Sequence, residues 1–309
     1  MKKLLASLVR RLAYASGFSL ARAKGMKVAR VVMFHGVGDD EYSTAEFKEH
    51  LELFAKHFTV VPLHSLIRKM ENREAFTDEL ALTFDDGLRN NFTEAYPVLK
   101  RLQLPATFFV CPGIVESKGW LWNQEARARL QSLGVEQRLK VFAELGTGAR
   151  LDVESVIEWM KHLSIDARLS AEQTIRLATD TFRPSPVHVV KYEMMTWDDL
   201  RSLDPRLITI GSHTVNHPIL ATLESDELRF EISESRRLLE EKLGRTVDQF
   251  CYPNGSHNPA VVEEVRKHYR AAVTTEPGFV DGADDLVQLP RIGIVPQPLL
   301  SWRMHRPTA

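Results

Sequence analysis

Short apolar segments that alternate with helical patterns are the feature that most limits what this 309-residue chain can fold into. The segments occupy residues 30–34, 59–61, 80–84, 106–110, 207–210, 249–251 and 271–274. Apolar strands separated by helices predict an α/β fold with a parallel sheet or barrel whose strands are buried on both faces. In such folds functional side chains gather after the carboxyl ends of the strands, so the residues there are the first candidates for chemistry.

Residues 119–192 break this alternation because they contain only helical patterns. We therefore predict a barrel formed by residues 28–118 and 193–309, with a helical insertion at 119–192. The insertion would serve as a lid or as one wall of a substrate site. Trp120 and Trp122, near its beginning, are candidates for lining a groove, although aromatic residues more often pack in a core.

The composition excludes several classes of protein. The net charge of −1 gives no general basic field, so we expect no nucleic-acid partner. The two cysteines, Cys111 and Cys251, are too few to frame a disulfide-rich mini-domain. No apolar run is long enough to cross a bilayer as a helix.

The first 27 residues differ from the rest of the chain because they are basic and contain no acidic residue. Leucines at positions 4, 5, 8 and 12 follow helical spacing beside the basic side chains. This pattern predicts a basic amphipathic helix in residues 1–27 that contacts an anionic membrane surface peripherally. The alternatives are a cleaved signal peptide and a solvated helix packed on the domain. We expect a cytoplasmic location, with peripheral contact at the inner membrane face.

Two adjacent carboxylates, Asp85 and Asp86, follow the apolar segment at 80–84 and precede Gly87. Successive residues at the end of a strand point in different directions. One carboxylate can therefore bind a cation while its neighbour faces a substrate, and the cation would keep both ionised. An ordinary Asp-Gly turn is the alternative interpretation.

Two histidines four residues apart, His213 and His217, follow the segment at 207–210. They can share a metal if the loop between them coils by one turn. The spacing alone is a weak signal in a chain with eleven histidines, but the position after a strand strengthens it. With a carboxylate from elsewhere, a His–His–Asp set leaves an open position, as catalytic metal sites do.

A third cluster is the turn Pro253-Asn254-Gly255, which follows the segment at 249–251. Such a turn can present a backbone N–H to a pocket, as an oxyanion site requires. An ordinary turn remains the alternative.

Together the three clusters resemble the polysaccharide deacetylase family, the NodB homology domain of carbohydrate esterase family 4. The family hallmarks are a T-F-D-D-G strand end, found here at 83–87, and a histidine segment, found here as H-T-V-N-H at 213–217. The resemblance implies a distorted barrel of about seven strands. It also implies that Asp86, His213 and His217 bind a metal, with Asp85 as the general base and the backbone N–H of Asn254 stabilising the oxyanion.

Two parts of the family pattern are replaced in this chain. A late Leu-x-His motif supplies the general acid in many members and is absent here. The segment V-M-F-H-G-V at 32–37 is instead similar to that of a subset with permuted motifs, which makes His35 the candidate acid. His257 is a second candidate, and a structural role for His35 is a third interpretation. Cys251 stands where many members have an arginine that orients the base, so Arg291, after a strand-like segment at 286–289, is the candidate replacement.

The resemblance implies a metal-dependent hydrolase that removes an N-acetyl group from an amino sugar in a polysaccharide or glycan precursor. The expected partner is therefore an N-acetylated glycan. Zn²⁺ is the first choice for the metal, and Co²⁺, Ni²⁺ or Mn²⁺ suit the same ligands. Hydrolysis of another small amide, such as a formamide or ureide, is an alternative on the same site. A non-catalytic glycan-binding or scaffold protein is the other alternative, against which the retained Asp85 argues.

Overall fold

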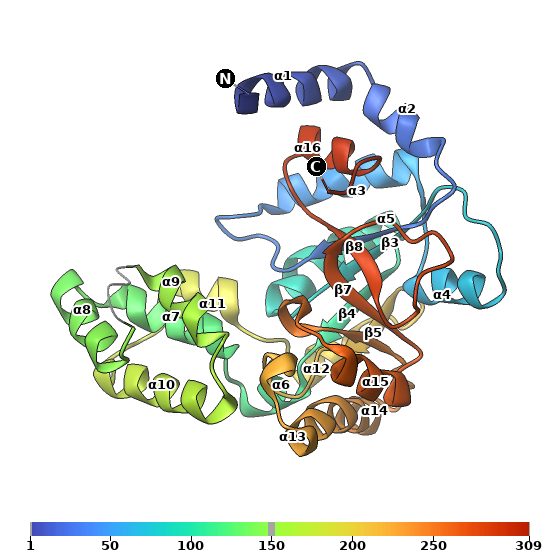
Figure 1. The fold of residues 1–309 in the computed structure, drawn as a ribbon. Helices are drawn as coiled ribbons and strands as arrows, with labels where there is room; N and C mark the ends of the chain where they lie inside the picture. The colour runs from blue at the N-terminus through green and yellow to red at the C-terminus, as the bar shows by residue number, and fades with distance from the viewer. Residues whose placement is uncertain (1, 148–151, 309) are drawn as a thin grey trace.

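A parallel barrel forms the centre of the computed structural model, which describes residues 2–147 and 152–308 (Figure 1). The strands lie in the order β1-β8-β7-β6-β5-β4-β3-β2, and β1 also pairs with β3. That extra pairing closes seven strands into a ring and leaves β2 outside it, beside β3. The strands are β1 (Arg30–Phe34), β2 (Thr59–Val60), β3 (Glu79–Phe84), β4 (Ala106–Val110), β5 (Ile208–Ser212), β6 (Gln249–Cys251), β7 (Ala271–Pro277) and β8 (Leu289–Gly293).

The seven-stranded barrel confirms the predicted fold class, and β1, β4 and β6 match their predicted bounds at both ends. All residues of β3 and β4 are buried, which explains why these strands are nearly continuous apolar runs in the sequence. The last strand differs from the prediction. It begins at Leu289 instead of residue 286, because a turn around Asp285 binds the backbone N–H groups of Val287 and Gln288.

Helices pack around the outside of the barrel, and α3 (Thr44–His57) shows why they form. Ser43 and Glu46 make a capping box at its beginning, which satisfies backbone N–H groups that would otherwise lack partners. Phe47, Leu51 and Phe54 follow helical spacing and are fully buried. The other helices around the barrel include α4 (Leu63–Glu71), α5 (Tyr96–Leu102), α6 (Pro112–Ser117), α12 (Trp197–Ser202), α13 (Ser225–Arg229), α14 (Ser235–Leu243) and α15 (Pro259–His268).

The helices between α6 and α12 gather on one side of the barrel, at the left of Figure 1. They are α7 (Trp122–Ser132), α8 (Val135–Glu144), α9 (Val153–Met160), α10 (Ile165–Ala178) and α11 (Pro186–Tyr192). Their apolar side chains form a cluster separate from the barrel core, with Phe142, Val156 and Met160 among its buried members. These helices therefore hold together largely through their own packing.

The first two helices lie outside the barrel, next to its last helix, α16 (Gln297–Arg303) (Figure 1). Helix α1 (Lys2–Ala15) packs on α16, and α2 (Phe18–Lys24) follows after Gly17, whose φ of 72° allows the change of direction. The buried Arg30 guanidinium of β1 donates to the carbonyls of Ala23 and Met304, each at 2.8 Å. It thereby ties both terminal segments to the barrel. None of the helices within residues 2–147 and 152–308 has the length and apolar content needed to cross a bilayer.

Candidate metal and catalytic site

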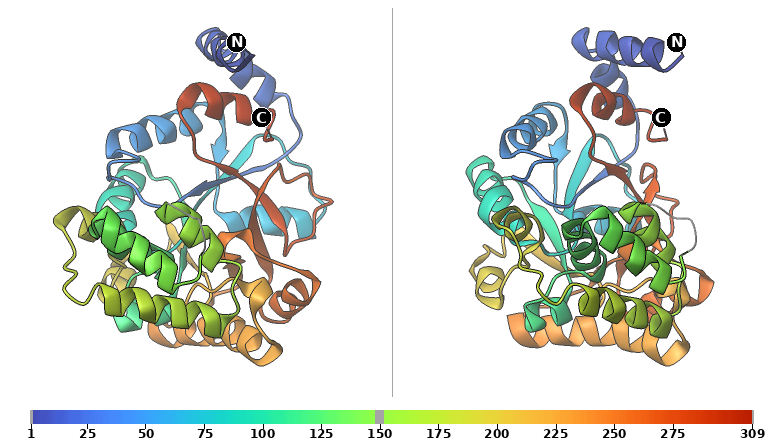
Figure 2. Two further views of the ribbon diagram at one scale, coloured as in Figure 1. Left: turned by 60° about the vertical axis from the view of Figure 1, so that its left-hand side comes forward. Right: turned by 90° about the vertical axis from the view of Figure 1, so that its left-hand side faces the viewer.

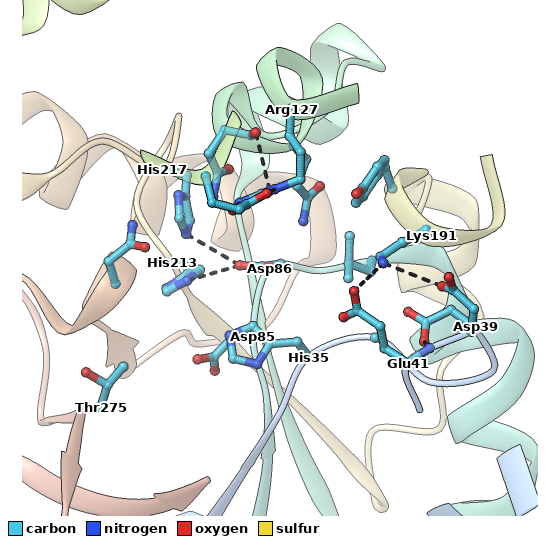
Figure 3. A pocket seen from close by; sticks show the side chains of 18 of the residues that line it. His35, Asp39, Glu41, Asp85, Asp86, Arg127, Lys191, His213, His217 and Thr275 are labelled. Carbon is cyan, nitrogen blue, oxygen red and sulfur yellow. Dashed lines mark hydrogen bonds and ion pairs between the residues drawn. The ribbon is translucent and has the colours of Figure 1, made fainter. Parts of the chain in front are cut away.

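A polar pocket of about 620 Å³ opens at the carboxyl ends of the barrel strands (Figure 3). Parallel strands bring their carboxyl ends to one rim, so residues far apart in sequence meet there. The pocket residues that the sequence had marked are His35, Asp85, Asp86, His213, His217 and Asn254. Arg291, the remaining marked residue, lies beneath the pocket and contacts Asp85.

Asp86, His213 and His217 converge on one point. Their candidate ligand atoms all lie within 4.8 Å of one another. The Asp86 Oδ1 atom is 3.5 Å from His213 Nε2 and 3.4 Å from His217 Nε2 (Figure 3). Two ligands of one tetrahedral zinc ion, each about 2.1 Å from it, would be about 3.4 Å apart. The three side chains therefore fit a single small divalent ion of the kind that imidazole and carboxylate bind.

Neighbouring groups fix the imidazole of His213 and the backbone of His217. His213 Nδ1 lies 2.7 Å from the Cys251 carbonyl, to which it donates its proton, and this leaves Nε2 free to act as a ligand. The His217 backbone N–H donates to Thr214 Oγ1, and the Trp122 indole N–H donates to the His217 carbonyl at 3.0 Å. These bonds hold the loop in the single turn that His213 and His217 need in order to bind the same metal ion. Trp122 is largely buried and supports this loop, and with Trp120 it also lines a second pocket between α7, α10 and α13.

Three residues of the two segments that carry the metal ligands have backbone conformations that side chains other than glycine rarely adopt. The φ angles are 74° for Asp86, 67° for Thr214 and 56° for His217. Such left-handed conformations cost free energy and persist only where the surrounding contacts enforce them. The contacts of the loop with Asp86 and of the loop with His213 and His217 therefore hold the metal-binding side chains in place, at a cost in local free energy.

Asp85 is held by Arg291 in a buried bidentate ion pair, with both N–O distances 2.7 Å. The three remaining N–H groups of the guanidinium also have partners: the Thr274 carbonyl, Thr83 Oγ1 and Cys251 Sγ. All five donors are therefore used, and the fork cannot rotate without losing several bonds. This arrangement fixes the plane of the Asp85 carboxylate.

The electrostatics of the site keep both carboxylates ionised. Burial by itself would raise the pKa of Asp85, but the Arg291 guanidinium holds it below the ordinary value. Burial acts in the same direction on Asp86, but the neighbouring His213 and His217 imidazoles hold its pKa well below the ordinary value. Ionised Asp86 suits a metal ligand, and ionised Asp85 suits an acceptor of protons.

His35 and Asn254 both reach the pocket, whereas His257 is not among its lining residues. His35 follows the end of β1, is exposed to the pocket and lies beside Asp85 in Figure 3. Asn254 is exposed at the rim, in the turn after β6, with a φ of 53°. His257 packs instead against the Tyr252 ring and bonds the Gly255 carbonyl through Nδ1 at 2.8 Å.

A comparison with protein-family models decides the family. The model of the polysaccharide deacetylase family matches residues 73–145 and 166–273, which is more than half of the chain. This chain belongs to the polysaccharide deacetylase family. The match includes the strand end with Asp85 and Asp86 and the loop with His213 and His217.

Relatives agree with this assignment at low sequence identity. A curated relative from Bacillus subtilis (strain 168), YxkH, carries a polysaccharide deacetylase name and is 20% identical over 272 residues, covering 86% of this chain and 71% of its own length. The structure of the Streptococcus pyogenes deacetylase PplD, in complex with acetate, is 19% identical, with a TM-score of 0.61 over 90% of this chain and 99% of that one. IcaB from Ammonifex degensii is 17% identical, with a TM-score of 0.61 over 91% and 98%. These two structures share the fold.

The insertion supplies pocket residues that the sequence did not single out. Asn123 and Arg127 come from α7, and Lys191 comes from α11. Arg127 pairs with Glu154 of α9, while Lys191 crosses the pocket edge to Glu41 at 2.6 Å (Figure 3). The sequence suggested a lid or a wall but not these residues, because the helices of the insertion carry no motif with a chemical signature.

Proposed function

We propose that this protein is a metal-dependent hydrolase that removes an N-acetyl group from an amino sugar in a polysaccharide or a glycan precursor. The observation that carries the proposal is the convergence of three metal-binding side chains beside a carboxylate that Arg291 holds ionised. Family membership supports acetylated glycan as the substrate class. The polar lining of the pocket is consistent with a substrate rich in hydroxyl groups.

The residues present fit a bound divalent ion, and Asp86, His213 and His217 would hold it. Two imidazole nitrogens with one carboxylate oxygen favour Zn²⁺, and Co²⁺, Ni²⁺ and Mn²⁺ are the alternatives for the same ligands. When bound, the ion supplies positive charge that polarises the amide carbonyl.

Asp85 acts as the general base in this proposal. It takes a proton from the water whose oxygen forms the new bond to the acetyl carbon. Arg291 does not touch the substrate, so it is a positioning residue. It orients the Asp85 carboxylate and keeps its pKa low, and the base is therefore ionised at neutral pH.

The later part of the reaction needs an oxyanion donor and an acid on the same rim. The backbone N–H of Asn254 would stabilise the negative oxygen of the tetrahedral intermediate. His35 would give a proton to the sugar nitrogen as its bond to the acetyl carbon breaks. The products are then acetate and the free amine of the sugar. Asn254 and His35 both line the pocket beside the metal ligands, which supports these roles.

The experiment that tests the function is acetate release from N-acetylglucosamine oligomers by the purified chain. Each sample is assayed as prepared, after chelation, and after add-back of Zn²⁺, Co²⁺, Ni²⁺ or Mn²⁺. Asp85→Asn is the matched negative control, since it keeps the three metal-binding side chains. Release that chelation stops, that a metal restores and that the variant lacks supports the proposal. A chain that holds a metal but releases no acetate contradicts the N-acetyl assignment, and a chain that binds no metal contradicts the site itself.

A further inference from the structure

Helix α1 turns Leu5, Leu8 and Leu12 away from the protein. Leu5, Leu8 and Leu12 are 63%, 54% and 62% exposed, and the helical spacing places them on one stripe. The side toward α16 is instead more polar. Tyr14 is half-buried there, and its hydroxyl donates to Gln297 Oε1 at 2.6 Å. A helix that served only this fold would bury its leucine stripe, so the orientation indicates that something outside the fold covers it.

The position of this stripe is fixed by the fold. Helix α1 packs on α16, and both views of Figure 2 place it at the outer edge of the molecule. Arg30 bonds the Ala23 carbonyl at the end of α2 and the Met304 carbonyl after α16. The Arg30 guanidinium also packs against the Phe58 and Phe279 rings. The leucine stripe is thereby presented at a defined site, clear of the pocket.

The N-terminal segment itself carries charge of a single sign, although Glu49 and Glu52 of α3 lie beside the end of α1. The chain contains no acidic residue before Asp39, and the exposed side chains beside and after α1 include Arg11, Arg22, Lys24 and Lys27. A leucine stripe among cations complements a lipid surface, whose headgroups are anionic and whose acyl chains are apolar. A second copy of this chain would present the same cations, so two such segments would repel each other. The charge therefore selects a lipid surface over a dimer.

We propose that α1 docks this protein peripherally on an anionic lipid bilayer, with Leu5, Leu8 and Leu12 entering the boundary between headgroups and acyl chains. The basic side chains of the same segment contact the lipid phosphates. This proposal does not depend on the proposed function, because none of its residues belongs to the pocket.

Vesicle sedimentation with the whole chain tests the docking. The chain is mixed with vesicles of phosphatidylcholine alone, or of phosphatidylcholine with phosphatidylglycerol. We expect it to sediment with the anionic vesicles and to stay in solution with the neutral ones. Added salt should weaken the binding because it screens the charges. Sedimentation that is equal for both lipids would contradict the electrostatic part of the proposal, and its absence with both would overturn docking.

Two variants and a matched control locate the surface. Leu8→Asp with Leu12→Asp should weaken binding to anionic vesicles at least about tenfold, because it puts charge where the helix enters the lipid. The control is Leu139→Asp with Leu177→Asp, which changes two exposed leucines of the insertion and should bind as the unchanged chain does. Arg11→Gln with Arg22→Gln should cost roughly fivefold for each charge removed. Equal losses in the α1 pair and the control pair would overturn the assignment to α1.

Light scattering of the same chain tests whether a second copy of the chain, instead of lipid, covers the leucine stripe. We expect a mass that is the same for the unchanged chain and the Leu8→Asp, Leu12→Asp variant. A dimer that this variant dissociates would overturn the lipid proposal in favour of a second copy. Because both leucines are exposed, the variants should fold, and an unchanged melting temperature checks this.

Discussion

Two arginines, one lining the pocket and one beneath it, bind a carboxylate in the same way but in different surroundings. Arg291 of the barrel grips Asp85 through two bonds of 2.7 Å, and the pair is almost completely buried. Arg127 of the insertion grips Glu154 through two bonds of 2.7 and 2.9 Å, but Glu154 is largely exposed. The buried pair fixes one group in one orientation, whereas the exposed pair leaves its members free to exchange partners. We infer that the barrel performs the chemistry and the insertion adjusts what binds.

The largest effect should come from the metal ligands on the barrel side. His213→Ala should remove the metal and lower kcat/KM at least about 10⁴-fold, since the ion contributes several kcal/mol to transition-state stabilisation. The measurement is bound metal per chain together with acetate release. His257→Ala is the matched control because His257 is not a pocket residue. A His213→Ala protein that keeps its metal would contradict the ligand set.

Asp85→Asn should come next, with a loss of about 10³-fold in kcat and with metal binding retained. The amide cannot accept the proton from water, yet its shape preserves most contacts of the carboxylate. Kinetics and metal analysis of the same sample check this. Loss of metal in this variant would show that Asp85 is itself a metal ligand, which would contradict its assignment as the base.

Arg291→Gln and Arg127→Gln should differ strongly in their cost to the free energy of unfolding. Leaving Asp85 buried without its partner should cost about 3–5 kcal/mol of unfolding free energy, measured by denaturant titration. Arg127→Gln, the matched control on the insertion, should cost less than about 1 kcal/mol. Similar costs for both would contradict the comparison.

The same substitution should also change the pH dependence of kcat. A base works in its deprotonated form, so activity is lost as pH falls through its pKa. The lowered pKa of Asp85 shifts its own contribution to this loss to lower pH than an ordinary aspartate would give. Without Arg291 the burial of the carboxyl raises the pKa, so the acid limb should move to higher pH. A merely structural role for Arg291 would leave that limb in place.

His35→Ala should lower kcat roughly 10²-fold without emptying the metal site. The loss reflects the missing proton for the departing amine, so substrates with a better leaving group should be affected less. Rates for an acetylated sugar and an activated acetate ester, measured in parallel, check this. Full activity of the variant would overturn the assignment of the acid to the end of β1.

Lys191→Gln should have the smallest effect, a rise in KM within about tenfold and little change in kcat. Lys191 makes its ion pairs with Asp40 and Glu41 at the pocket edge, away from the metal ligands. Steady-state kinetics on oligomers of several lengths measure the effect. A large fall in kcat would show that the insertion takes part in the chemistry.

The sequence alone predicted the parts of the fold and site that depend on local patterns. The apolar runs identified the strands, and the polar residues after them identified Asp85, Asp86 and the two histidines. It did not reveal tertiary contacts that no motif marks, although the family resemblance did suggest Arg291 as the partner of the base. The Trp122 indole reaches the His217 carbonyl across 95 positions, and no local signal marks that bond. The pocket role of Arg127 was hidden for the same reason, because an arginine on an amphipathic helix looks like any solvated side chain.

The pairing of Asp85 with Arg291 also ties the site to the closure of the barrel. Arg291 belongs to the last strand, β8, which lies between β7 and β1 and completes the ring. If β8 detached alone, the buried Asp85 charge would lose its partner at once, so fraying of this strand is penalised far more than its few backbone bonds suggest. Amide hydrogen exchange in β8 should therefore be slow and should match that of β3. Closure of the barrel by β8 and the pairing of the base with Arg291 therefore depend on each other.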